Sequence, residues 1–219
     1  MDKKVLLVEG INDELFFSNF CQVHGYDVHV KVKKPSSVAP GHNDNKQGVL
    51  QLLQVYIKLL APNSVEKLGV IVDADYITSG GGVQTTLTQI HDKIKEHGYT
   101  SSAIQLSDSS YCFEKDDKSN RLSIWIMPNN LDEGYLEHWI TNNIEDNEKT
   151  YFNKISDFID NFSEKKIGNI QIPKAKIQVW LACQRKPLQD MRTVIHNNYL
   201  DQNKQQYLNF KNWLSNTFI

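Results

Sequence analysis

The residues best suited to chemistry in this sequence are three carboxylates that each follow a short apolar run. Glu9 follows the run at residues 4–8, and Asp73 and Asp75 follow the run at residues 68–72. In an extended backbone, side chains two positions apart point to the same side, so Asp73 and Asp75 would face one point. Paired carboxylate oxygens are the ligands that Mg²⁺ prefers in proteins. The spacing therefore predicts a magnesium site.

Carboxylates that gather without a cation repel one another, so such a cluster implies either a bound metal or a raised pKa. Gly10 directly follows Glu9. A glycine there allows a tight turn and lets a phosphate approach the amino end of the next helix, so we expect Gly10 to bind phosphate. Asp13 comes near the start of that helix, where its charge favours the helix dipole. We expect Asp13 to have a structural role rather than a catalytic one.

The segments around these residues alternate between strand and helix patterns. Short apolar runs predict four core strands at residues 4–8, 28–32, 68–72 and 122–127. Apolar residues at helical spacing predict helices at residues 12–24, 49–60, 87–94 and 135–140. The runs are continuously apolar, as in parallel strands covered on both faces. Ligands bind beyond the carboxyl ends of such strands, and Glu9 and Asp73 both fall there.

The rest of the chain adds a hairpin and a helical end. The polar stretch at residues 101–120 suggests an inserted hairpin, and helical patterns recur near residues 151–162, 175–183 and 207–218. The sequence contains no convincing linker and no internal repeat. We therefore expect an α/β core at residues 1–145 and a helical C-terminal elaboration at residues 146–219, packed on the same domain.

Composition narrows the functional classes. The net charge of −2 argues against a protein that coats DNA through bulk electrostatics, so any contact with nucleic acid must use local patches. No apolar run approaches the roughly 20 residues of a membrane span, and we expect a cytoplasmic protein without a membrane partner. The cysteines and histidines lack zinc-site spacing, which leaves His138, beside Glu137, as the one histidine candidate.

Two motifs resemble those of the Toprim superfamily, which includes topoisomerases, bacterial primases, recombination-mediator proteins and the overcoming-lysogenization-defect nucleases. They are V-E-G-x-x-D at residues 8–13 and D-x-D at residues 73–75, in that order within one strand-helix series. The segments at residues 125–137 and 174–182 resemble an uncharacterised family of small stand-alone Toprim-like proteins. This closer resemblance covers nearly the whole chain. It implies a Toprim-like, Rossmann-like fold with a mainly parallel central sheet flanked by helices.

The resemblance also implies roles for the three carboxylates. Asp73 and Asp75 would hold Mg²⁺ or Mn²⁺. Glu9 would be either a further metal ligand or the group that transfers a proton when a phosphodiester is made or broken. All three residues are thus expected to be catalytic, and two ions could stabilise the attacking and leaving oxygens.

Three further residues are candidates by the same resemblance. In the nuclease branch a glutamate after the fourth strand joins the metal site, which corresponds to Glu137; the alternative is a surface carboxylate on a helix. Lys174 and Lys176 would neutralise charge that develops on phosphate and so act in catalysis. The alternative for both lysines is a solvated helix position.

Departures from the family patterns favour hydrolysis. The chain has no zinc ribbon, no G-x-x-x-x-G-K-[ST] loop and too few residues for a complete topoisomerase. We expect a Mg²⁺-dependent nuclease acting on DNA or RNA. One alternative is a regulatory module that works with a separately encoded ATPase. The other is a phosphotransfer enzyme acting on nucleotides or small phosphorylated molecules. The sequence also leaves open whether the chain forms a homo-oligomer.

Overall fold

The computed structural model describes residues 2–26, 30–61, 64–164, 166–187 and 189–219. A six-stranded sheet forms its centre, in the order β2-β1-β3-β6-β5-β4. The first four strands of this order are parallel to one another. The strand β5 pairs antiparallel with β6, and β4 pairs antiparallel with β5. The strands are β1 (Lys4–Leu7), β2 (Lys31–Lys33), β3 (Lys67–Asp73), β4 (Ile104–Gln105), β5 (Tyr111–Glu114) and β6 (Arg121–Met127).

This arrangement confirms the predicted α/β class with a mainly parallel, Rossmann-like sheet. The stretch at residues 101–120 forms the expected hairpin, and its strands β4 and β5 extend the sheet beyond the four predicted strands. The predicted strand at residues 28–32 falls partly on residues 28 and 29, which lie outside the described residues; β2 begins at Lys31.

The apolar runs form strands because both faces of the sheet are buried. Leu6 and Trp125 pack into a hydrophobic cluster on one face. Leu7 and Ile124 belong to a second cluster on the opposite face. Successive residues of a strand point to opposite faces, so a run that is apolar at every position can fill both clusters.

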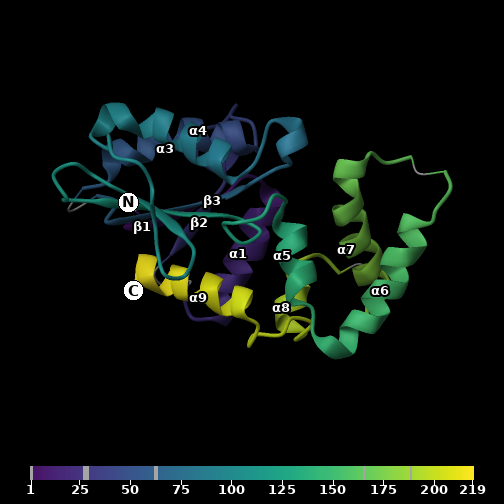
Figure 1. Cartoon of the computed structure of the whole chain (residues 1–219). Helices are drawn as coiled ribbons and strands as arrows, with labels where there is room; N and C mark the ends of the chain where they lie inside the picture. Colours follow the sequence, from purple (N-terminus) through teal and green to yellow (C-terminus); the bar gives the residue numbers. More distant parts are fainter. Residues whose placement is uncertain (1, 27–29, 62–63, 165, 188) are drawn as a thin grey trace.

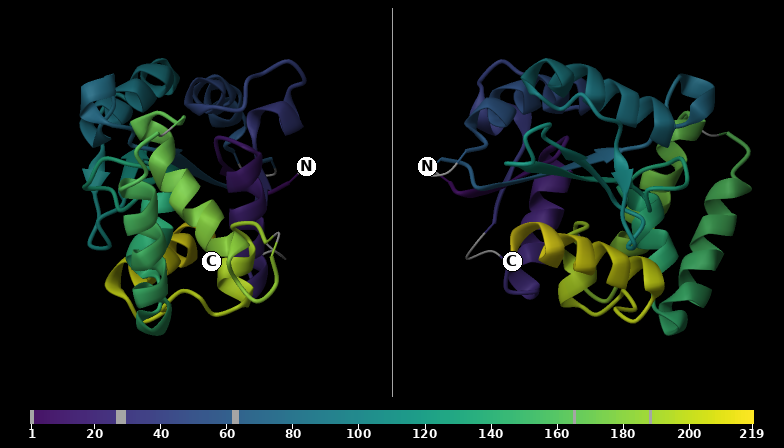
Figure 2. Two further views of the ribbon diagram at one scale, coloured as in Figure 1. Left: turned by 90° about the vertical axis from the view of Figure 1, so that its right-hand side faces the viewer. Right: turned by 60° about the vertical axis from the view of Figure 1, so that its left-hand side comes forward.

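Helices cover the two faces in separate layers (Figures 1 and 2). One face carries α3 and α4, and the other carries α1, α5 and α9. Short helices α2 (Pro35–Val38) and α8 (Thr193–His196) lie in the connections. The longer ones are α1 (Ile11–Val23), α3 (Lys46–Leu59), α4 (Val83–Ile94), α5 (Leu136–Asn143) and α9 (Gln205–Phe218). In the described part of the chain, no helix combines the length and apolar character needed to cross a membrane.

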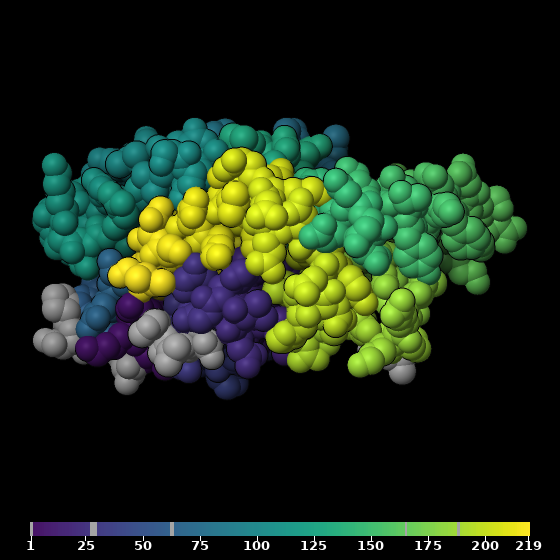
Figure 3. All heavy atoms as spheres, turned by 90° about the horizontal axis from the view of Figure 1, so that it is seen from below, coloured from purple at the N-terminus to yellow at the C-terminus, as the bar shows by residue number. Residues whose placement is uncertain are grey.

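The expected C-terminal elaboration divides into two different parts. Its last helix, α9, packs directly on β3 and β6, beside α1 (Figure 3). The contact is close: a Cβ atom at Gly69 would lie 2.8 Å from the ring of Phe218. The other part is the pair α6 (Asp146–Asp160) and α7 (Ile172–Ala182), which pack on each other and extend to one side (Figures 1 and 3). Thus α9 is a layer of the sheet domain, whereas α6 and α7 extend away from the sheet.

Candidate functional site

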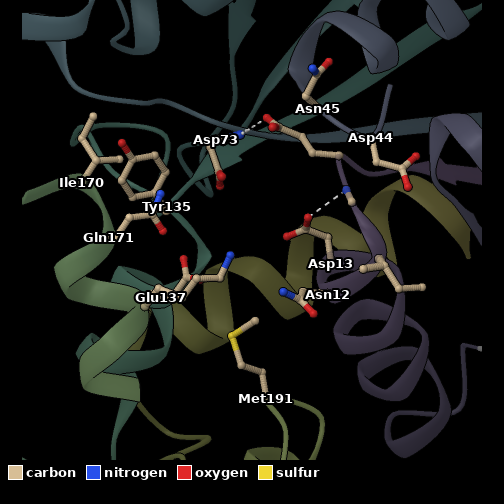
Figure 4. A pocket seen from close by; sticks show the side chains of 14 residues that line it. Asn12, Asp13, Asp44, Asn45, Asp73, Tyr135, Glu137, Ile170, Gln171 and Met191 are labelled. Carbon is tan, nitrogen blue, oxygen red and sulfur yellow. Dashed lines mark hydrogen bonds between the residues drawn. The ribbon is translucent and has the colours of Figure 1, made fainter. Parts of the chain in front are cut away.

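A cavity of about 360 Å³ lies beyond the carboxyl ends of β1 and β3. We call it the carboxylate cavity, because five acidic side chains line it together with one lysine; one of the five, Asp44, is paired with Lys34. Figure 4 shows that Asp13, Asp73 and Glu137 reach it from three different elements. The residues that matter for the argument are Glu9, Asp13, Asp73, Glu137 and Lys174.

Glu9 and Asp73 are directly connected. The Asp73 backbone N–H donates a hydrogen bond to Glu9 Oε1 at 2.8 Å, which places the two predicted site residues side by side. Burial raises the pKa of Glu9 to about 7, although this hydrogen bond and the charge of Lys46 oppose the shift. Burial and then the charge of Glu9 hold the pKa of Asp73 well above its ordinary range. The cluster is therefore a set of crowded acids that a cation would stabilise.

Asp13 has a larger part in the site than the sequence suggested. It lies in the first turn of α1 as expected, and its Oδ2 accepts a hydrogen bond from the Gly10 N–H at 2.9 Å. It also lines the carboxylate cavity. Burial and the nearby charge of Glu137 raise the pKa of Asp13 to about 6. Because Asp13 already occupies the Gly10 N–H, the phosphate contact expected of Gly10 would have to compete with this bond.

Glu137 and Lys174 complete the cavity. Glu137 lies in the first turn of α5 and is only 9% exposed, so the alternative of a surface carboxylate is wrong. Lys174 is half-buried in the first turns of α7, and its charge lowers the pKa of Asp13. Lys176 takes a different direction and pairs with Asp160 of α6 at 2.6 Å. Residues two apart on a helix do not share a face, which separates these two lysines.

The backbone of Asp75 corrects one premise of the sequence analysis. Its φ of 60° lies in the left-handed region, so the chain from Asp73 to Asp75 is not extended as expected. The Asp75 side chain instead forms an ion pair with Lys46 of α3. It lines an adjoining hollow of about 480 Å³, which we call the second hollow. Asp75 still lies near enough to raise the pKa of Asp73.

The carboxylate cavity and the second hollow adjoin each other at the edge of the sheet, and we call the two together the groove. Four residues line both of them, namely Glu9, Asn45, Tyr135 and Ile170. Asn45 is also the N-cap of α3, where its side chain accepts a hydrogen bond from the Gly48 N–H at 2.9 Å. Sequence reasoning missed Lys46, Asn45 and Tyr135. The one available signal was an asparagine before an apolar periodic segment, which is typical of a helix N-cap.

His138 supports the site through its contacts with Tyr135 and Tyr76. Its Nδ1 accepts a hydrogen bond from the Tyr135 N–H at 3.1 Å, and its Nε2 lies 3.3 Å from the Tyr76 hydroxyl. Burial lowers the pKa of His138, in keeping with a neutral ring that orients this loop. These contacts give His138 a role in holding Tyr135 beside the groove.

The donors around the carboxylate cavity suit a hard cation in kind. All five acidic side chains offer oxygen, which Mg²⁺ and Mn²⁺ prefer over the nitrogen and sulfur donors typical of zinc sites. As the side chains stand, no three His, Cys, Asp or Glu residues in the described ranges are close enough together to hold one ion. Binding would therefore require side chains such as Glu9 to rotate toward Asp73.

Comparison with known proteins gives one match. The sequence model of a family described as "Protein of unknown function (DUF3226)" matches residues 3–219. No curated protein and no solved structure gives a significant match.

Proposed function

The chain belongs to the DUF3226 family, and we propose that it is a Mg²⁺- or Mn²⁺-dependent phosphodiesterase acting on nucleic acid. The observation that carries the proposal is the convergence of five carboxylates and Lys174 on one cavity at the carboxyl ends of parallel strands. Ligands of open parallel sheets bind at this edge. The resemblance of residues 8–13 and 73–75 to the Toprim motifs supports the same chemistry.

The residues that would hold the ion are Glu9, Asp73 and Glu137, with Asp13 beside them. A cation there would offset the burial and the mutual repulsion that now raise the pKa of Glu9, Asp13 and Asp73. When bound, the ion would supply Lewis-acid polarisation of a phosphoryl oxygen.

Other steps belong to the side chains themselves. The Lys174 ammonium faces the carboxylate cavity and can stabilise negative charge that develops on phosphate. Where Glu9 does not itself coordinate the ion, its carboxylate can accept a proton from an attacking water, which is the part of a general base. If Glu9 acts in this way, Glu9→Gln will retain affinity for the ion and lose turnover.

The shape of the groove favours a polymer over a small molecule. The carboxylate cavity continues into the second hollow through four shared residues, so a chain of nucleotides could occupy both. Lys46 and Lys174 lie one in each part of this groove. Lys174 supplies local positive charge that the net charge of −2 does not, whereas Asp75 compensates the charge of Lys46.

The test is a cleavage assay on single- and double-stranded DNA and RNA with Mg²⁺ or Mn²⁺. Asp73→Asn should reduce cleavage on the order of a hundredfold or more, as expected for loss of a group that stabilises the transition state. Asp92→Asn, an exposed position on α4, is the matched control and should retain activity. An absence of cleavage by the wild-type chain on every substrate, both alone and with a separately encoded ATPase, would contradict the proposal and favour a regulatory module.

A further inference from the structure

We propose that Lys46 takes the place of a second cation at Asp75, so that the site of this chain holds a single divalent ion. The inference rests on the proposed function, because it specifies how many ions that site uses. It concerns the second hollow and its ion pair, and assigns Asp75 a different part from Glu9 and Asp73.

The position of Lys46 is fixed by its surroundings. Its side chain is only 11% exposed, and Nζ contacts Asp75 Oδ2 and lies 3.4 Å from Thr86 Oγ1. Lys46 is the first residue of α3, directly after the N-cap Asn45. The helix dipole disfavours a cation at this end of a helix. The anionic side chain of Asp75 therefore compensates both the dipole and the loss of solvent at this ammonium.

Asp75 is held on its other side by the backbone. Its N–H donates to the Gly134 carbonyl at 3.2 Å, and its neighbour Ala74 accepts a hydrogen bond from the Gly82 N–H at 2.7 Å. The loop packs so closely that a Cβ atom at Gly81 would lie 2.5 Å from Asp75 Cβ. Asp75 thus has little freedom to swing its carboxylate out of the second hollow by moving its backbone.

The ammonium also acts on the carboxylate cavity. Lys46 and Glu9 line the same hollow, so the ammonium lies near a residue that both parts of the groove share. A divalent ion placed at Asp75 would have to displace this ammonium or stand beside it against like-charge repulsion. In the carboxylate cavity, by contrast, no ion pair within the described part of the chain joins Lys174 to Glu9, Asp13, Asp73 or Glu137.

The number of bound ions tests the inference without any measurement of activity. Calorimetric titration of the full chain with Mn²⁺ should give one ion per chain. Asp75→Asn should still bind one ion, with an affinity within about threefold of wild type, whereas Asp73→Asn should lose binding. Two ions in the wild type, or loss of the single ion in Asp75→Asn, would overturn the inference and leave the proposed function intact. No bound ion in the wild type would overturn the proposed function itself.

Replacing the ammonium provides the converse test. Lys46→Met should free Asp75 and raise the count to two ions, with a spin-coupled manganese pair in the electron paramagnetic resonance spectrum. Lys58→Met, an exposed position on the same helix, is the control and should stay at one ion with an uncoupled spectrum. A count of one in a folded Lys46→Met variant would overturn the inference. If that variant does not fold, the Asp75→Asn titration still decides.

Discussion

Glu9 is a carboxyl group that holds its proton more tightly in the folded chain than in the unfolded one. Its pKa rises from 4.5 to about 7 on folding, chiefly through burial. Its contribution to stability is therefore complete below pH 4.5 and is lost as the pH rises through about 7. With a chelator present to remove metal ions, the free energy of unfolding should decline between pH 5 and pH 8. The decline should be about 1.4 kcal/mol for each unit by which folding raises the pKa of Glu9. Urea unfolding at both pH values measures it.

Glu9→Gln provides the comparison, because glutamine keeps the shape of the side chain and does not titrate. The part of the decline that belongs to Glu9 should be missing from this variant. A decline of equal size in both proteins would assign the pH dependence to other groups, such as Asp13 or Asp73. The affinity for Mg²⁺ should show the opposite trend and weaken below pH 7 in the wild type, since a proton competes with the ion for Glu9.

Asp73 should limit the stability of the metal-free protein. Its carboxylate is buried beside Glu9, Asp13 and Glu137, which holds its pKa well above the ordinary range. Asp73→Asn removes one charge from this crowd, so at pH 8 in a chelator the variant should be more stable, by about 1 kcal/mol or more. Urea unfolding again measures the change, with Asp92→Asn as the control. A loss of stability would mean that Asp73 makes a structural contact which outweighs the repulsion.

At the scale of elements, α9 decides how the sheet is covered. It lies across β3 and β6, and the glycine at position 69 makes room for the ring of Phe218. Gly69→Ala should lower the free energy of unfolding by about 1–3 kcal/mol, because an added methyl group must displace packed atoms. Gly168→Ala is the matched control, since no atom lies within 4 Å of the added Cβ there. Denaturant unfolding of both variants provides the measurement.

The second variant Phe218→Leu separates overpacking from other effects of Gly69→Ala. A leucine is smaller than the ring and leaves room for the new methyl group, so the two changes together should cost less than the sum of the single changes. Strict additivity would show that the cost of Gly69→Ala arises elsewhere, for example in the strand backbone. Either result concerns only the layer that α9 adds to the sheet.

At the scale of the whole molecule, the site is assembled from distant parts of the chain. Glu9 follows β1, and Asp73 is the last residue of β3. Glu137 lies in the first turn of α5, and Lys174 lies on α7. The sheet brings the first two together, because parallel neighbours end at the same edge. The helices α5 and α7 pack on each other and close the cavity from the opposite side. The assembly of the site therefore depends on the packing of the C-terminal half as much as on the sheet.

The sequence by itself determined the α/β class, the parallel strands and the placing of Glu9 and Asp73 at strand ends. These features follow from apolar runs and helical periodicity, which are local and survive without knowledge of the fold. It also indicated that the polar stretch before β6 forms a hairpin. The apolar pattern of α9 was equally visible, but its position on the sheet was not.

Only the tertiary structure decided how the charged residues pair. The ion pair of Lys46 with Asp75 joins residues 29 positions apart, and it depends on a left-handed backbone at Asp75 that no sequence rule requires. The burial of Glu137 and the place of Asp13 in the cavity likewise depend on α5 and α1 packing around one edge. Charged side chains follow no local periodic pattern, so long-range packing decides which of them pair. Apolar residues repeat with the period of the helix or strand to which they belong, so they indicate each element directly.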